Sequence, residues 1–118
     1  MAQAQKAVAT ENASRRAEHL ISYLLLLLDA KRGDEAGGVA DELREIEALH
    51  GERLWLWHPS RMMYGFARLA ALKGQAAEAA AFVARGRILF EADVARLGEE
   101  VRASLETLPF NRGLLEWV

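Results

Sequence analysis

The stretch of residues 23–33, YLLLLLDAKRG, places five leucines in a row and then turns abruptly to charged residues. Five consecutive leucines cover more than one turn at about 3.6 residues per turn, so a helix built from them is apolar on every side. Such a helix must be covered all round, by a membrane, by its own chain or by another protein. The choice among these three constrains the fold more than any other feature of the sequence.

The leucine run is too short for a membrane. From residue 20 to residue 28 the apolar stretch has nine residues, whereas a spanning helix needs about twenty. Glu18 and His19 stand directly before it and no small-residue cleavage site follows, so the pattern of a secretory signal peptide is missing. The chain also lacks cysteine, which fits a reducing compartment. We therefore predict a soluble, cytoplasmic protein.

The amino-acid composition favours an all-α fold. The chain has 118 residues, of which 52% are hydrophobic. This share rests on alanine and leucine, which are strong helix formers, and β-branched residues are few. The length suits one domain with a modest core. We expect residues 1–13 to form a flexible leader or a helix extension, and residues 14–118 to form a single helical-repeat domain.

Glycines and prolines divide the chain into about five helices. Ser14 can cap a first helix that Gly33 ends, and Asp34 can cap a second helix that Gly51 ends. Pro59 suits the first turn of a third helix, because the N–H that proline lacks would have no partner there. The predicted helices span about residues 14–32, 34–50, 59–73, 75–97 and 99–108, and Asn111 caps a final turn after Pro109.

The first four predicted helices form two hairpins that look like copies of each other. Placing Gly33 on Gly74, an offset of 41 residues (74 − 33), pairs Tyr23 with Tyr64. Each hairpin then consists of an apolar helix, a glycine turn and an alanine-rich helix. One such hairpin cannot bury its own apolar face, so it must stack on a neighbour. This plan predicts a short array of antiparallel helical hairpins.

The second hairpin, in residues 60–92, resembles a tetratricopeptide repeat. The positions that carry the resemblance in MYGFARLAALKGQAAEAAAFVARG are Met63, Phe66, Ala67, Gly74, Ala79, Val83 and Gly86. The first hairpin, in residues 19–50, fits less well, because Gly38, Glu42 and Glu45 fall on the inward positions of its second helix. The resemblance implies a right-handed array, and the tail LETLPFNRGLLEWV is similar to the ends of repeat regions in bacterial signalling regulators.

Residue patterns for catalysis are missing from the sequence. The three histidines have no metal-ligand spacing, and there is no glycine-rich phosphate loop and no GxSxG nucleophile motif. The formal net charge is only −2 and basic residues alternate with acidic ones, so no stripe of positive charge is available to follow a phosphate backbone. We therefore expect no catalytic residue, no metal, no cofactor, and no nucleic-acid or membrane partner.

A cluster of aromatic residues with interleaved arginines gives the best candidate for a binding site. Tryptophan, tyrosine and arginine dominate the energetics of protein interfaces. The tetratricopeptide resemblance further implies that the first helix of each hairpin lines a concave groove. A competing interpretation is that the tryptophans only pack the connector against the helices. The predicted partner-binding residues are Leu20, Tyr23, Leu27, Trp55, Trp57, Arg61, Tyr64 and Arg68.

These features lead to two hypotheses about function. The first is a non-catalytic protein–protein interaction module of bacterial regulation, a scaffold that binds a peptide or protein segment or associates with a second copy as a homo-oligomer. The alternative is an α-helical sensor domain whose small ligand binds near Trp55 and Trp57, against the alanine-lined helix 75–84. The chain could also be one piece of a larger regulator.

Overall fold

The computed structural model describes the backbone of residues 2–118 and the side chains of residues 9–51 and 53–118. Within these residues the chain forms helices joined by turns and contains no strand, so the predicted all-α fold is confirmed. Contacts between residues divide the chain into two compact units, Met1–Trp57 and His58–Val118. The sequence had suggested one domain over 14–118, and the boundary between the units lies inside that range.

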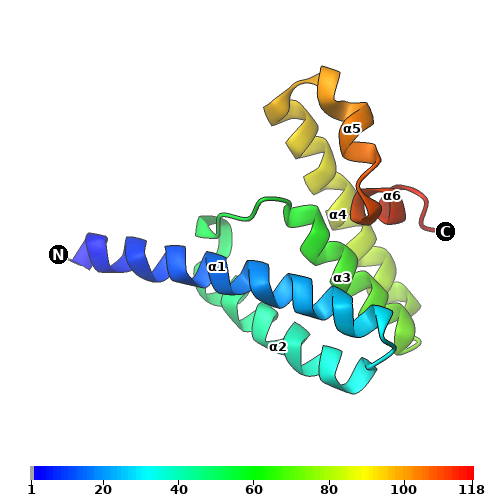
Figure 1. Ribbon diagram of the computed structural model, residues 1–118, viewed down its shortest axis with the longest axis horizontal. Coiled ribbons are helices and arrows are strands. Elements are labelled where there is room, and N and C mark those ends of the chain that lie inside the picture. Colours follow the sequence, from blue (N-terminus) through cyan, green and yellow to red (C-terminus); the bar gives the residue numbers. More distant parts are fainter. Residues whose placement is uncertain (1) are drawn as a thin grey trace. The chain divides into compact units, whose positions relative to one another are not determined.

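Unit 1 is an antiparallel hairpin of two helices, α1 (Ala2–Asp29) and α2 (Gly33–His50), followed by the short 3-10 helix η1 (Gly51–Arg53) (Figure 1). Helix α1 begins well before the predicted start at Ser14, and its N-terminal end extends past the end of α2. The Arg16 Nε atom donates to the Glu42 carboxylate at 2.8 Å and links the two helices. The buried apolar side chains of this unit are Ala17, Ile21, Leu24, Leu27, Leu28, Ala36, Val39, Ala40 and Leu43.

The turn between α1 and α2 differs from the predicted glycine turn at Gly33. The N–H of Arg32 donates to the Leu27 carbonyl at 2.9 Å, and the N–H of Lys31 donates to the Leu28 carbonyl at 3.1 Å. This pair of bonds is the Schellman arrangement, in which one residue takes a left-handed conformation. That residue is Lys31, with φ of 61°, so Gly33 becomes the first residue of α2.

Unit 2 begins with a second hairpin, α3 (Pro59–Leu72) and α4 (Ala76–Leu97), whose turn has the same hydrogen bonds. Gln75 donates to the Ala70 carbonyl at 2.9 Å and Gly74 donates to the Ala71 carbonyl at 3.0 Å. Gly74, with φ of 75°, therefore corresponds to Lys31 and not to Gly33. The offset between the two turns is 43 residues (74 − 31), two more than the sequence alignment had used.

The new offset pairs buried positions of the two second helices. With 43 residues between equivalent positions, Ala36 pairs with Ala79 and Ala40 pairs with Val83, and all four side chains are buried. The glutamates that seemed to occupy inward positions of α2 move to its outer side. The two hairpins therefore share both their turn geometry and the burial pattern of their second helices.

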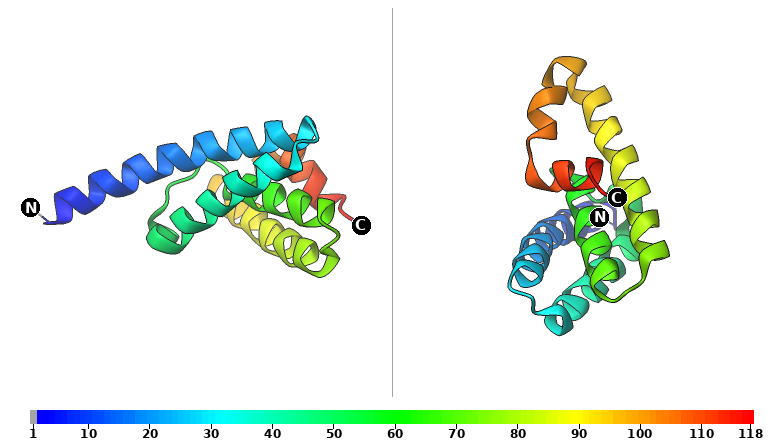
Figure 2. Two further views of the ribbon diagram at one scale, coloured as in Figure 1. Left: turned by 90° about the horizontal axis from the view of Figure 1, so that it is seen from below. Right: turned by 90° about the vertical axis from the view of Figure 1, so that its right-hand side faces the viewer.

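After α4 the chain folds back through the 3-10 helix η2 (Glu99–Val101), α5 (Arg102–Glu106) and α6 (Pro109–Leu115) (Figure 2). Helix α6 contacts both α3 and α4. Pro59 and Pro109 each stand at the start of a helix, where a missing N–H costs nothing. Among the apolar clusters of this unit are one of Ala67, Val83 and Leu114 and one of Phe90, Val94 and Leu105.

Candidate functional site

The connector between η1 and α3, residues 54–58, is held to α1 by two hydrogen bonds from its backbone N–H groups to side chains of that helix. The N–H of Trp55 donates to the Ser14 hydroxyl at 2.9 Å, and the N–H of Trp57 donates to a Glu18 carboxylate oxygen at 3.1 Å. Ser14 in turn donates to the Thr10 carbonyl at 2.9 Å. Ser14 and Glu18 lie four residues apart, so they share one face of α1. Ser14, predicted to cap a helix, instead anchors the connector.

The two tryptophans of this connector form an exposed pair. Their ring centroids are 4.8 Å apart and the ring planes meet at 68°, which is an edge-to-face contact. Each side chain remains 64% exposed. Large aromatic side chains are on average more buried than this in folded domains. The sequence predicted both tryptophans as partner-binding residues, and the structure brings their rings into contact.

Of the three contact residues predicted on the leucine helix, only Tyr23 is well exposed. Leu27 is only 2% exposed and Leu20 is half-buried, whereas Tyr23 is 46% exposed. The leucine that faces outward is Leu26, at 64% exposed. Tyr23 and Leu26 are three residues apart and share a face, so the outward side is rotated away from the predicted one.

The remaining predicted residues, Arg61, Tyr64 and Arg68, belong to α3 in unit 2 and are half-buried. The Arg68 guanidinium carbon lies 5.6 Å from the centroid of the Tyr64 ring, a cation–π distance. The same ring packs against Gly113 of α6, where an added Cβ would lie 2.7 Å from Tyr64 Cζ. Tyr64 therefore meets the chain's own C-terminal helix instead of lining an open groove.

The C-terminal helix is held by contacts of Gly86 and Arg87 that the sequence did not predict. Leu114 fits over Gly86, since a Cβ there would lie 2.8 Å from a Leu114 methyl group. Arg87 donates to the Leu114 carbonyl at 2.9 Å and to the Trp117 carbonyl at 3.0 Å. The sequence feature that could have indicated this packing is the glycine inside α4 and inside α6, because glycine in a helix interior often marks close packing.

A buried hydrogen-bond pair ties α6 to the start of α3. The Ser60 hydroxyl donates to Asn111 Oδ1 at 2.8 Å, and Asn111 Nδ2 donates to the Leu105 carbonyl at 3.0 Å. Both side chains are fully buried. Asn111, predicted to cap the last turn, lies within α6 and cross-links three segments.

The side chains of His58, which is half-buried, and Asp93, which is buried, lie close to each other in unit 2. His58 Nδ1 lies 3.6 Å from Asp93 Oδ2, and the Arg96 guanidinium lies 3.3 Å from Asp93 Oδ1. Neither His58 Nδ1 nor Asp93 Oδ2 makes a hydrogen bond within the described residues. The Ser60 hydroxyl nearby donates to Asn111, so no nucleophile–base hydrogen bond is assembled here.

Unit 2 also carries a charged cluster around Arg102. Its guanidinium donates two hydrogen bonds of 2.8 Å to the Glu91 carboxylate and also bonds Glu99. These hydrogen bonds lower the pKa of Glu91 and raise the pKa of Arg102. The cluster ties α4 to the segment that follows it, and both carboxylates are exposed.

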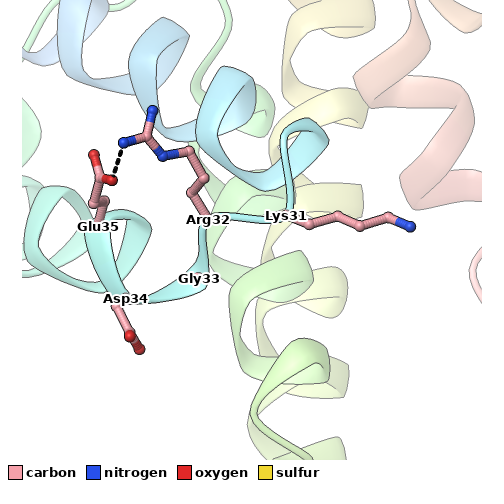
Figure 3. Close-up of a pocket in the computed structure, with 5 residues that line it drawn as sticks. All are labelled: Lys31, Arg32, Gly33, Asp34 and Glu35. Atoms are coloured by element: carbon pink, nitrogen blue, oxygen red, sulfur yellow. Dashed lines mark ion pairs between the residues drawn. The ribbon is translucent and has the colours of Figure 1, made fainter.

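A hollow of about 380 Å³ lies on the turn between α1 and α2, lined by Lys31, Arg32, Gly33, Asp34 and Glu35 (Figure 3). Arg32 and Glu35 form an ion pair, and the Lys31 and Asp34 side chains point in different directions. The lining consists of the last two residues of the turn and the first three of α2, and the hollow is open to solvent. It therefore lacks the enclosed apolar walls of a small-molecule site.

The described residues include no cluster of three or more histidine, aspartate or glutamate side chains that could hold a metal ion. Of the helices in this part of the chain, none combines the length and the apolar character needed to cross a bilayer. Comparisons with protein-family models, with curated proteins and with solved structures return no match for this chain.

Proposed function

We propose that the chain is a non-catalytic protein–protein interaction module and that Trp55 and Trp57 form the centre of its binding surface. The observation that carries this proposal is the exposed edge-to-face pair, with both side chains 64% exposed. Tryptophan is among the residues most enriched in binding hot spots. Its rigid ring contributes a large contact area at a small cost in conformational entropy.

The anchoring of the pair supports the same proposal. The backbone beneath both rings is held by Ser14 and Glu18 of α1, so the rings project from a fixed support. A preorganised surface binds with a smaller entropic penalty than a mobile loop does. The competing interpretation, in which the tryptophans only pack the connector, predicts buried rings, and the half-buried neighbours Leu54 and Leu56 are better suited to that role.

The resemblance to a tetratricopeptide repeat supports the proposed function less strongly than the tryptophan pair of the connector does. The shared turns of the two hairpins support a repeat relationship. However, the face of α3 that carries Tyr64 is already covered by α6. The small-ligand alternative is less favoured, because sensor pockets enclose most of the ligand surface and these two rings stand open.

A selection from a random peptide library displayed on phage tests the proposal. The immobilised full-length chain should enrich peptides that lose binding to the variants Trp55→Ala and Trp57→Ala. Substitutions at exposed rings should leave the helical circular dichroism unchanged, and Leu49→Ala, at an exposed leucine of α2, is the matched control. If every enriched peptide binds the Trp55→Ala/Trp57→Ala double variant as well as the wild type, the proposed surface is wrong.

A further inference from the structure

The size of the tryptophan surface limits what can occupy it. A fully exposed tryptophan offers up to about 250 Å², so two rings at 64% exposure present roughly 300 Å² together. A stable folded interface needs about 800 Å² from each partner. The pair is therefore too small to hold a folded partner or a second copy by itself, and it suits a few residues of a linear segment.

The backbone beneath the rings limits how that segment can bind. The N–H groups of Trp55 and Trp57 donate to α1, and the N–H of Leu54 donates to the Gly51 carbonyl at 3.2 Å. Pro59, two residues beyond Trp57, has no N–H. A ligand that adds as a β-strand needs a row of such donors. With these three donors used and none on Pro59, the connector offers no continuous row of donors. We therefore expect a segment to bind mainly through its side chains and carbonyls.

The rings themselves indicate what those side chains should be. The two indole planes meet at 68° and form an apolar corner, and each indole also carries one N–H donor. Proline rings stack on aromatic faces, and a polyproline II segment offers carbonyl acceptors while needing no backbone partners of its own. Such a segment is also ordered before it binds, which lowers the entropic cost.

A cationic residue that precedes the pair in the sequence suggests the charge of one end of the ligand. Arg53 is exposed and lies two residues before Trp55. A carboxylate at the matching end of the segment can pair with its guanidinium, which would fix the direction in which the segment lies. Surface ion pairs contribute little affinity, so we expect orientation and modest selectivity from this contact.

We propose that the Trp55–Trp57 corner binds a proline-rich segment in the polyproline II conformation, with an acidic residue at the end beside Arg53. This inference rests on the proposed function of the same surface. It names the chemical class of the partner, whereas the proposed function requires only that some segment binds there.

The test uses the full-length chain labelled with ¹⁵N and a synthetic peptide of ten prolines ending in two glutamates. The three indole N–H signals are assigned with Trp55→Phe, Trp57→Phe and Trp117→Phe. The signals of Trp55 and Trp57 should shift saturably, with Kd between about 1 mM and 1 μM, and the signal of Trp117 should stay in place. Trp55→Ala or Trp57→Ala should weaken binding at least about tenfold.

Two control peptides separate the parts of the proposal. A glycine–serine peptide of equal length with the same two glutamates should cause no saturable shift. Exchanging the glutamates for lysines should weaken binding about two- to fivefold, and Arg53→Gln should remove that difference. Equal binding of the proline and glycine–serine peptides, or no shift with either, would overturn the proposal.

The library selection then tells two kinds of failure apart. Enriched peptides that require both tryptophans but contain no proline would overturn the polyproline inference and leave the interaction surface standing. An absence of tryptophan-dependent peptides, together with no response to the proline peptide, would overturn both. Tryptophan-dependent peptides rich in proline support both.

Discussion

Lys31 and Gly74 occupy the same position in the two helical hairpins, with φ of 61° and 75°. In each turn the residue donates its N–H to a carbonyl three residues earlier and the next residue donates to one five residues earlier. A left-handed conformation is free of steric cost for glycine but not for lysine. The first hairpin therefore carries local backbone strain that the second avoids.

This relationship predicts that Lys31→Gly stabilises unit 1. Removing the strained side chain should raise the free energy of unfolding by about 0.5–1 kcal/mol, after the greater flexibility of glycine in the unfolded chain is subtracted. The measurement is urea denaturation followed by circular dichroism. The reciprocal control, Gly74→Ala, should destabilise by about 1 kcal/mol. Loss of stability in Lys31→Gly would contradict the assignment of the turn.

The same turn shows what the sequence could and could not predict about the repeat. The glycine rule found the end of α3 at Gly74, and it failed at α1 because a lysine holds the left-handed position there. The preference of glycine for the left-handed conformation does not reveal a turn in which lysine adopts that conformation instead. The alignment was therefore displaced by two residues, and Glu42 was assigned to the inward position that the buried Ala40 holds.

The contact between Gly113 and Tyr64 gives a second prediction. An added Cβ at Gly113 would lie 2.7 Å from Tyr64 Cζ and 2.8 Å from its hydroxyl oxygen. Gly113→Ala should therefore destabilise unit 2 by about 1–3 kcal/mol, as overpacking does. In a Tyr64→Ala background the clash is absent, and the helix preference of alanine should make the same change neutral or stabilising. Thermal unfolding of the four variants measures this reversal of sign.

The buried pair of Ser60 and Asn111 gives a third prediction. Asn111→Ala removes the acceptor of the buried Ser60 hydroxyl. It also removes one of two donors to the Leu105 carbonyl, which keeps the N–H of Leu108 at 3.2 Å. We expect a loss of about 2–4 kcal/mol. Ser60→Ala should cost about 1–3 kcal/mol, and the double variant should cost less than the sum, because it leaves fewer groups unsatisfied. Strict additivity in chemical denaturation would show that the two side chains do not interact.

The candidate site was only partly accessible from the sequence. Trp55 and Trp57 were identified because tryptophan is among the residues that dominate protein interfaces, and their contact joins two positions close in the chain. The outward side of α1 was placed on Leu27 because five leucines give no amphipathic pattern to orient the helix. The role of α6 was missed because its contacts with Gly86 and Arg87 join positions nearly thirty residues apart, as the 27-residue separation of Arg87 and Leu114 shows.

The hydrogen bonds between Arg102 and Glu91 predict a pH dependence of stability. They hold the pKa of Glu91 below its ordinary value of 4.5 in the folded protein. A carboxyl group with a lowered folded pKa stabilises the native state at pH values above its unfolded pKa, and this contribution disappears as the pH falls through the folded pKa. The stabilisation should therefore be complete at pH 6 and be lost progressively below about pH 4.5.

The variant Glu91→Gln isolates this contribution. At pH 6 its urea midpoint should be lower than that of the wild type, because the amide cannot form the charged pair with Arg102. Below the folded pKa the two midpoints should converge, since the wild-type carboxyl is then neutral as well. Glu106→Gln, on α5 and exposed, is the matched control and should show no such convergence. A difference between Glu91→Gln and wild type that is constant from pH 6 to pH 3 would mean that packing, and not charge, holds this contact.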